Sequence, residues 1–275
     1  MVTQPDQVQC KIDNFPSKIM DKKLLLSVAN FIEFSKQNAN PLGEILSSVQ
    51  SKYYCPFLYD IQKEQLKVFV YNHFYSYYDY PMILPVCSLN GIISFWYEEG
   101  FPIYPHESLS DFINLFQTPY LQEKYKQNRQ DFLDNAQTVR ENREELSDST
   151  FDKSQLNQRI LSQRISRLMP EKDPHGKPIH SKYQKEIVNK ILKYDDISQI
   201  SEALYLEGLF FDYRFIKRNK KPEEQDFMDI EHIVNAILFS DIFMTKDRVL
   251  NQFIENLRKK QLFSCLPEIK QKFNC

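Results

Sequence analysis

The chain has 275 residues, and its 35 lysines and arginines against 37 aspartates and glutamates give a formal net charge of −2. This near balance excludes a histone-like polyelectrolyte, and 42% hydrophobic with 26% charged residues excludes a disordered chain. Only five glycines are present and no glycine-rich phosphate-binding motif occurs, so the nucleotide-binding loops built on such motifs are excluded as well.

Five cysteines at irregular spacing form no C-x-x-C pair, which indicates reduced thiols in a cytoplasmic protein and neither a disulfide framework nor a zinc knuckle. The first residues lack the basic and apolar regions of a signal peptide. The longest uncharged stretch, 80–97, contains two prolines and a glycine, so it favours a buried strand, turn and helix. We therefore expect no membrane association.

The first third of the chain predicts short elements. Residues 1–22 are expected to be irregular, and the strongly apolar segment 24–34 opens the ordered part. Residues 53–58 and 66–75 are aromatic and β-branched, which favours two short strands. A helix is expected over 108–116, where serines are available as N-caps.

The middle of the chain predicts helices. From 120 to 168 the sequence is rich in Gln, Glu, Arg, Lys and Asn with sparse apolar residues, which is typical of long solvated helices that pack along one narrow stripe. The proline- and glycine-containing stretch 170–178 is expected to be a loop. Further helices are expected over 182–194 and 197–217.

The most informative segment lies near the C-terminus. Apolar residues recur there at helical spacing and predict a helix over 226–239, with Asp229 beside its buried face. A short apolar run over 241–245 predicts a buried parallel strand, with Thr245 and Asp247 at its carboxyl end and a helix over 247–259. In open α/β sheets ligands bind at that end of the strands, so Asp229 and Asp247 could converge on a cation.

These residues resemble the C-terminal half of the PIN-like ribonucleases, in which an Asp opens an apolar helix and the next strand ends in Thr-x-Asp. Asp229, Thr245 and Asp247 stand in that order. The segment 24–34 resembles the family's strand that ends in Ser and is followed by a helix-borne Glu, which makes Glu33 the second family acid. The stand-in for the family's opening Asp is Asp13.

The resemblance implies an α/β fold: a PIN-like three-layer core with a short parallel sheet and a large, mainly helical insertion. The core would comprise 23–50 and 195–275, after the irregular segment 1–22, with 51–194 as the insertion. It implies a metal-dependent endoribonuclease that cleaves single-stranded RNA, as a toxin or defence effector with an antitoxin or other protein partner. The catalytic residues would be Asp229, Asp247, Glu33 and Thr245.

The implied cofactor is Mg²⁺ or Mn²⁺, because carboxylate oxygens are hard ligands that suit these ions. Its ligands would be Asp229, Asp247, Glu33 and Asp13. The most basic stretch of the chain directly precedes the acidic helix, where a basic rim would bind the phosphate backbone. Its members are Arg214, Lys217, Arg218, Lys220 and Lys221.

Structural explanations compete with each assignment. An Asp-x-x-Asp pattern before an apolar helix, as at Asp226 and Asp229, also describes an N-cap and its helix-dipole partner. The basic stretch suits a solvated helix end, and the aromatic string 71–78 suits core packing as well as stacking on unpaired bases. The alternative function is therefore a catalytically degenerate PIN-like or helical protein-interaction module.

Overall fold

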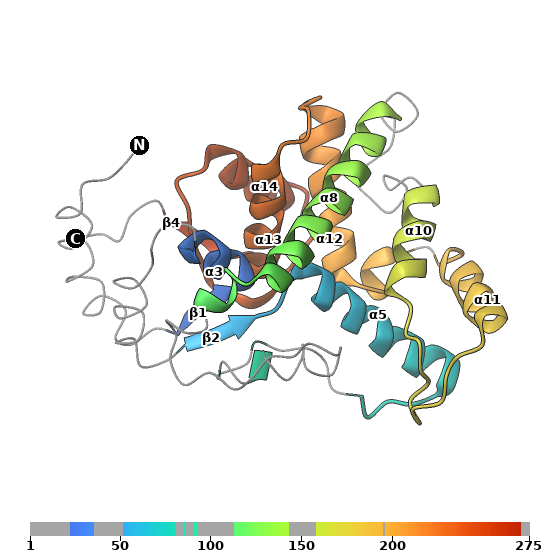
Figure 1. The fold of residues 1–275 in the computed structure, drawn as a ribbon. Coiled ribbons are helices and arrows are strands. Elements are labelled where there is room, and N and C mark those ends of the chain that lie inside the picture. Colours follow the sequence, from blue (N-terminus) through green and yellow to red (C-terminus); the bar gives the residue numbers. More distant parts are fainter. Residues whose placement is uncertain are drawn as a thin grey trace.

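The computed structural model describes residues 23–35, 52–80, 85, 88, 91–92, 113–142, 158–194 and 196–270. Over these residues the protein is an α/β mixture in which helices dominate and four short strands form two separate parallel pairs (Figure 1). No helix in these ranges is long and apolar enough to cross a membrane. Asp13 and the segment 36–51 lie outside the described residues.

The first strand pair brings together two segments of the N-terminal part. Strand β1 (Leu24–Ser27) runs directly into helix α3 (Val28–Ser35), as the resemblance implied for this segment. Strand β2 (Lys52–Cys55) lies parallel to β1, with Ser27 opposite Cys55. The side chain of Asn30 accepts hydrogen bonds from both the backbone N–H and the hydroxyl of Ser27, which fixes the turn from strand into helix.

Helix α5 (Leu58–Tyr75) corrects one prediction, because the segment 66–75 is not a strand but the second half of this helix. Its buried residues Leu58, Gln62, Leu66 and Val70 recur at every fourth position, which places them on one helix face. The aromatic and β-branched composition of the segment was therefore overridden by packing along one helix face.

The polar middle region forms long helices, as its composition predicted. Helix α8 (Pro119–Glu141) buries a single stripe that includes Tyr125 and Phe132 and exposes most of its remaining surface. Helices α10 (Gln158–Leu168) and α11 (Ser181–Ile191) flank a loop that a Lys172–Pro178 bridge closes into a narrow turn. The loop expected over 170–178 is confirmed.

The C-terminal part follows the predicted order helix, strand, helix. A short 3₁₀ turn η2 (Ile197–Gln199) leads into helix α12 (Glu202–Phe211), which continues as a π-helical segment η3 (Asp212–Lys217). Helix α13 (Glu224–Phe239), strand β3 (Ile242–Met244) and helix α14 (Arg248–Lys259) come next. Strand β4 (Glu268–Lys270) lies beyond the last element that the sequence predicted, and it pairs in parallel with β3.

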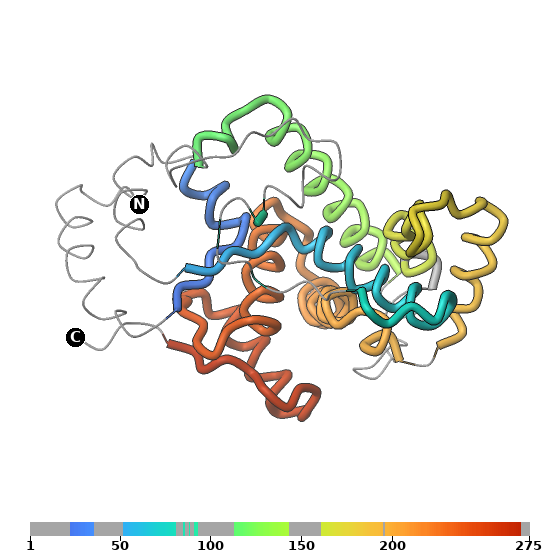
Figure 2. The backbone as a smooth tube through the Cα atoms, turned by 90° about the horizontal axis from the view of Figure 1, so that it is seen from below, coloured from blue at the N-terminus to red at the C-terminus, as the bar shows by residue number. Residues whose placement is uncertain are grey.

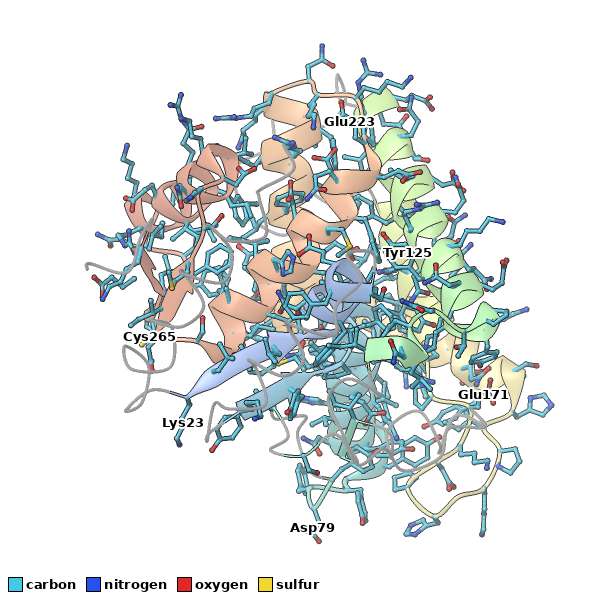
Figure 3. The ribbon with its side chains drawn as sticks, turned by 60° about the vertical axis from the view of Figure 1, so that its left-hand side comes forward. Lys23, Asp79, Tyr125, Glu171, Glu223 and Cys265 are labelled. Atoms are coloured by element: carbon cyan, nitrogen blue, oxygen red, sulfur yellow. The ribbon has the colours of Figure 1, made fainter. Side chains whose placement is uncertain are left out.

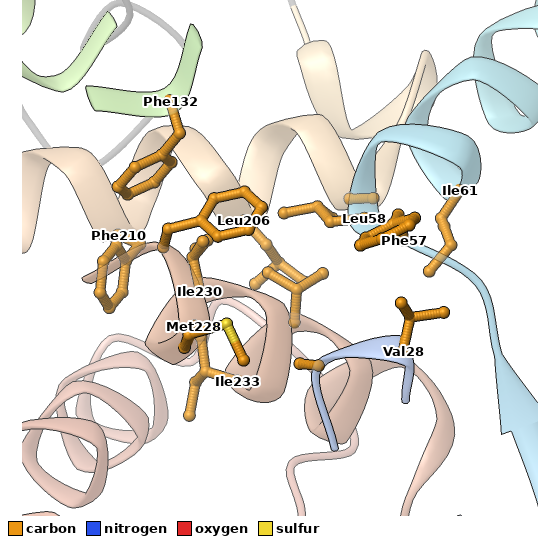
Figure 4. Packing of buried hydrophobic residues seen from close by; sticks show 14 of the residues in the cluster. Val28, Phe57, Leu58, Ile61, Phe132, Leu206, Phe210, Met228, Ile230 and Ile233 are labelled. Carbon is orange, nitrogen blue, oxygen red and sulfur yellow. The ribbon is translucent and has the colours of Figure 1, made fainter. Parts of the chain in front are cut away.

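Two hydrophobic clusters hold these elements together. The larger one gathers β1, α3, α8, α12, α13 and α14, and its centre is the apolar face of α13 (Figure 4). The smaller one joins the second half of α5 to α10 and α11, which gather at the end of α5 that lies away from β1 (Figure 2). Helix α13 contacts β1, α3, α5, α8 and α12, so a side chain on its solvent border is held from several directions.

Candidate functional site

The start of α13 is fixed by a capping box. Glu223 is the N-cap residue, and the carboxylate of Asp226 accepts a hydrogen bond from the Glu223 backbone N–H at 2.8 Å. Asp226 is fully buried, and it accepts a hydrogen bond from Arg214 Nε at 2.6 Å and lies 3.3 Å from Lys220 Nζ. The capping interpretation of the first aspartate of the Asp-x-x-Asp pattern is therefore correct.

Asp229 lies one helical turn further along α13. Its side chain is only 5% exposed, and Gln225 Nε2 donates to its Oδ1 at 3.2 Å. Burial raises the pKa of Asp229 above the ordinary aspartate value; the bond from Gln225 opposes this, and the negative charge of Asp247 adds to it. Among the described residues of the predicted metal-ligand set, Asp247 is the one whose charge contributes to this shift.

Asp247 is the N-cap of α14 and is exposed. Its Oδ1 accepts hydrogen bonds from the backbone N–H groups of Val249 at 2.6 Å and Leu250 at 3.1 Å. The Asp247 N–H donates to Thr245 Oγ1 at 3.0 Å. Thr245 therefore shapes the turn between β3 and α14, and this turn carries the second acid toward the first.

Glu33 reaches the same helix through a histidine. Its Oε2 lies 3.4 Å from Nε2 of His232, which stands one turn after Asp229 on α13. Glu33 is 38% exposed and His232 is 19% exposed, so the pair lies at the border of the buried face. The three described acids of the predicted set therefore lie around one stretch of α13, with His232 between Glu33 and Asp229.

These side chains do not form a complete metal cage in the described part of the chain. Within it, no group of three or more His, Cys, Asp or Glu side chains is arranged so that it could hold a metal ion. The fourth predicted ligand, Asp13, lies outside the described residues.

The basic stretch before α13 is partly engaged in ion pairs with the protein's own acids. Besides the bonds from Arg214 and Lys220 to Asp226, Lys217 Nζ lies 2.7 Å from Asp212 Oδ2. The other two cations are exposed; Arg218 lies over the ring of Tyr213 and donates to Gln252, and no ion pair of Lys221 is seen with any described residue. The stretch thus braces the start of α13 and leaves Arg218 and Lys221 at the surface.

A second polar cluster, which the sequence did not reveal, lies inside the protein where α5, α10, α12 and α13 meet. Arg164 Nη2 donates to Glu207 at 3.2 Å and to Gln62 at 2.9 Å, and Gln62 Nε2 donates to the other oxygen of Glu207 at 2.8 Å. Glu231 Oε2 accepts from the backbone N–H of Leu58 at 2.9 Å. These groups border a cavity with room for about one water molecule.

The ionisation of this cluster is unusual. Burial, assisted by the nearby carboxylates of Asp60 and Glu207, raises the pKa of Glu231 to about 8 against the hydrogen bond from Leu58 and the charge of Arg164. The sequence alone does not reveal this cluster, because the partners of Glu231 lie 24 to 173 residues away along the chain. The cluster joins helices of the middle region to α13.

Comparisons with known proteins add no relative. A scan against protein-family models, a search of curated proteins and a search of solved structures each returned no match.

Proposed function

We propose that this protein is a divalent-metal-dependent endoribonuclease with a PIN-like core that cleaves single-stranded RNA. The observation that carries the proposal is that the charge of Asp247, which follows a strand end, adds to the raised pKa of the buried Asp229 carboxylate. Two such carboxylates repel each other unless a cation lies between them. A strand end that presents acids is also where α/β proteins bind their ligands.

The donor set suits Mg²⁺ or Mn²⁺ in its chemistry, because these ions prefer carboxylate oxygens and retain several waters. Asp229 and Asp247 would hold the ion, and Glu33 would join them as a third ligand or through a bound water. When bound, the metal would lower the pKa of a water and offset the charge that develops on the phosphodiester.

The protein's own residues would orient this chemistry. Gln225 holds one oxygen of Asp229, and the turn at Thr245 holds the backbone of Asp247. One oxygen of Asp247 is occupied by the amides that begin α14, which leaves the other oxygen to face a ligand. Arg214, locked on Asp226, contributes positive charge that lowers the pKa of Asp229 and would attract a phosphate.

The test replaces each acid with its amide. In Asp229→Asn the amide oxygen can still accept from Gln225, and in Asp247→Asn asparagine is a good N-cap, so both variants should fold. We expect each variant to cleave single-stranded RNA at least about 100-fold more slowly than the wild type with Mg²⁺ or Mn²⁺. Chelation of the metal should slow the wild type to a similar extent. Asp241→Asn, an exposed acid just before β3, is the matched control and should retain full activity.

Thermal unfolding supplies a readout that does not depend on activity. Titration with Mn²⁺ should raise the melting temperature of the wild type and of Asp241→Asn but not of Asp229→Asn. Undiminished cleavage by Asp229→Asn would refute the proposal. Equal Mn²⁺ stabilisation of all three proteins would show that the metal binds elsewhere.

A second candidate is a catalytically degenerate PIN-like or helical protein-interaction module. The contact between Glu33 and His232 favours it, because a carboxylate that faces a histidine has less need of a metal. In this case none of the acid-to-amide variants would change any RNA cleavage, and an antitoxin or another protein would bind instead. Both candidate functions include the cytoplasmic location that is expected from the sequence.

A further inference from the structure

One surface of the protein lies at the far end of α5 and is built from three segments. Its members come from the end of α5 and the residues after it, from the turn 171–179, and from α11 and the residues that follow. In Figure 3, Asp79 and Glu171 mark this end of the molecule, while Glu223, at the start of α13, lies at the opposite end of the view. The surface is therefore remote from the acids of α13.

Ring contacts hold the three segments together. His73 and Tyr194 lie with ring centroids 6.1 Å apart, and Tyr77 and His175 lie 6.2 Å apart. Tyr71, at the centre, packs edge-to-face against neighbouring tyrosines and donates its hydroxyl to the Lys172 carbonyl at 2.8 Å. The surface thus has a rigid aromatic floor, which fixes the positions of the side chains that emerge from it.

Two aromatic side chains of this region face solvent. Among the described residues only four large hydrophobic side chains are well exposed, and two of them, Tyr78 at 72% and Tyr194 at 37%, lie here. The string 71–78 therefore uses Tyr71 for core packing, whereas Tyr78 is free of ring contacts with described residues. An exposed ring on a rigid support is suited to stack on an unpaired base.

The same segments carry six exposed lysines, and none of them forms an ion pair with any residue that the structure describes. Four acidic residues accompany them within 71–80 and 171–194, namely Asp79, Glu171, Asp173 and Glu186, and Asp173 already accepts two backbone N–H groups within the turn. This local excess of positive charge occurs in a chain of net charge −2. The lysines are Lys172, Lys177, Lys182, Lys185, Lys190 and Lys193.

We infer that this lysine–tyrosine surface binds single-stranded RNA, with the lysines along the phosphate backbone and Tyr78 and Tyr194 against the bases. Unpaired cations and exposed rings on one rigid support are the combination that sequence-tolerant single-strand binding requires. The inference rests on the proposed RNA substrate and extends it, because it gives the enzyme a second RNA contact far from the acids. An RNA molecule bound to both sites would be anchored at this surface by one segment, and another segment of the same RNA would reach the acids of α13.

The test measures RNA binding separately from cleavage. Every variant is made in the Asp229→Asn background, and its affinity for a fluorescein-labelled 20-nucleotide oligouridine is measured without divalent metal. The charge variant combines Lys177→Glu, Lys185→Glu and Lys193→Glu, whose side chains are exposed and make no ion pair with a described residue. Its matched control carries Lys23→Glu just before β1, Lys126→Glu on α8 and Lys259→Glu on α14, with the same change in net charge.

We expect the charge variant to bind at least about tenfold more weakly than its control, and the slope of log affinity against log salt to fall by about 2. Tyr78→Ala should weaken binding by about tenfold, whereas Tyr120→Ala, which removes a 49% exposed tyrosine from α8, should not. Equal affinities of the charge variant and its control, or binding of a protein partner to this surface with RNA affinity unchanged, would overturn the inference.

The outcomes separate this inference from the proposed function. If the surface variants bind RNA more weakly but Asp229→Asn cleaves as well as the wild type, the RNA surface stands and the nuclease assignment fails. If Asp229→Asn abolishes cleavage while the surface variants bind RNA as tightly as their controls, the nuclease stands and the surface fails.

Discussion

Replacing Glu231 with glutamine should make the protein more stable at alkaline pH and leave its stability nearly unchanged at acidic pH. The side chain is 2% exposed and its pKa in the folded protein is about 8, against an ordinary value of 4.5. Between these two values the unfolded chain releases the proton while the folded protein retains it. The free energy of unfolding therefore falls as pH rises from about 4.5 to 8.

The size of the effect follows from the same two pKa values. At 1.36 kcal/mol for each pKa unit, the interval corresponds to a loss of about 5 kcal/mol by pH 8.5. Glutamine carries no titrating proton, and its side-chain oxygen can replace Glu231 Oε2 as acceptor for the Leu58 N–H. The variant should therefore keep the hydrogen bond and remove the pH dependence that belongs to this group.

The assay is urea unfolding of the wild type and Glu231→Gln, followed by circular dichroism at intervals from pH 4.5 to 8.5. Because other groups titrate equally in both proteins, the difference in unfolding free energy isolates residue 231. That difference should be near zero at pH 4.5 and rise steadily in favour of the variant. Glu186→Gln, an exposed glutamate on α11, should give a flat difference.

A difference between wild type and Glu231→Gln that is flat across this range would refute the reasoning, because it would mean that Glu231 is ionised in the folded protein at neutral pH. A variant less stable than the wild type at pH 8.5 would also refute it. That result would show that the ionised carboxylate is stabilised by Arg164 to a greater extent than burial and the neighbouring acids destabilise it.

Three further substitutions test other parts of the structure. Arg164→Met should cost roughly 3 to 5 kcal/mol in urea unfolding, because it leaves the buried Glu207 without its cation, whereas Arg167→Met, from an exposed pair, should cost under about 1 kcal/mol. Gly176→Ala should cost about 1 kcal/mol through its positive φ of 78° alone, since a Cβ there meets only open space; no loss would contradict the turn geometry. Asp229→Asn should raise stability at pH 7, and the gain should vanish in acid as the wild-type carboxyl protonates; a loss of stability at pH 7 would show that the charge is already compensated.

Local patterns predicted the elements of the C-terminal part well. The helix, strand and helix that contain Asp229, Thr245 and Asp247 occur in the expected order, because each is specified by periodicity and capping within its own segment. The segment 66–75 was predicted wrongly as a strand, since a run of aromatic and β-branched residues fits a strand and a buried helix face equally. A helix is distinguished from a strand here only because the helical spacing of buried residues extends back from residue 66 to Leu58.

Pairings between distant segments could not be predicted in the same way. Strand β4 is three residues long, and nothing in its own sequence marks it as a strand until β3 lies beside it. The sequence also gave no sign that β1 would pair with β2 while β3 pairs with β4, so that the described strands form two pairs and not one sheet. Register and partner are properties of the assembled core.

The candidate site combines both kinds of information. Asp229 and Asp247 were identified by type and spacing, but whether they face each other depends on how α14 packs against α13, and this is visible only in the electrostatic effect of one on the other. Glu33 was identified by the same reasoning, yet its nearest charged partner is His232. A short motif can therefore identify the acids. The packing of α3 against α13 decides whether the third acid, Glu33, is available to a metal or is held by a histidine. The mutation that separates these cases is His232→Ala: Mn²⁺ should stabilise this variant more than the wild type if the histidine competes for Glu33, and equally if it does not.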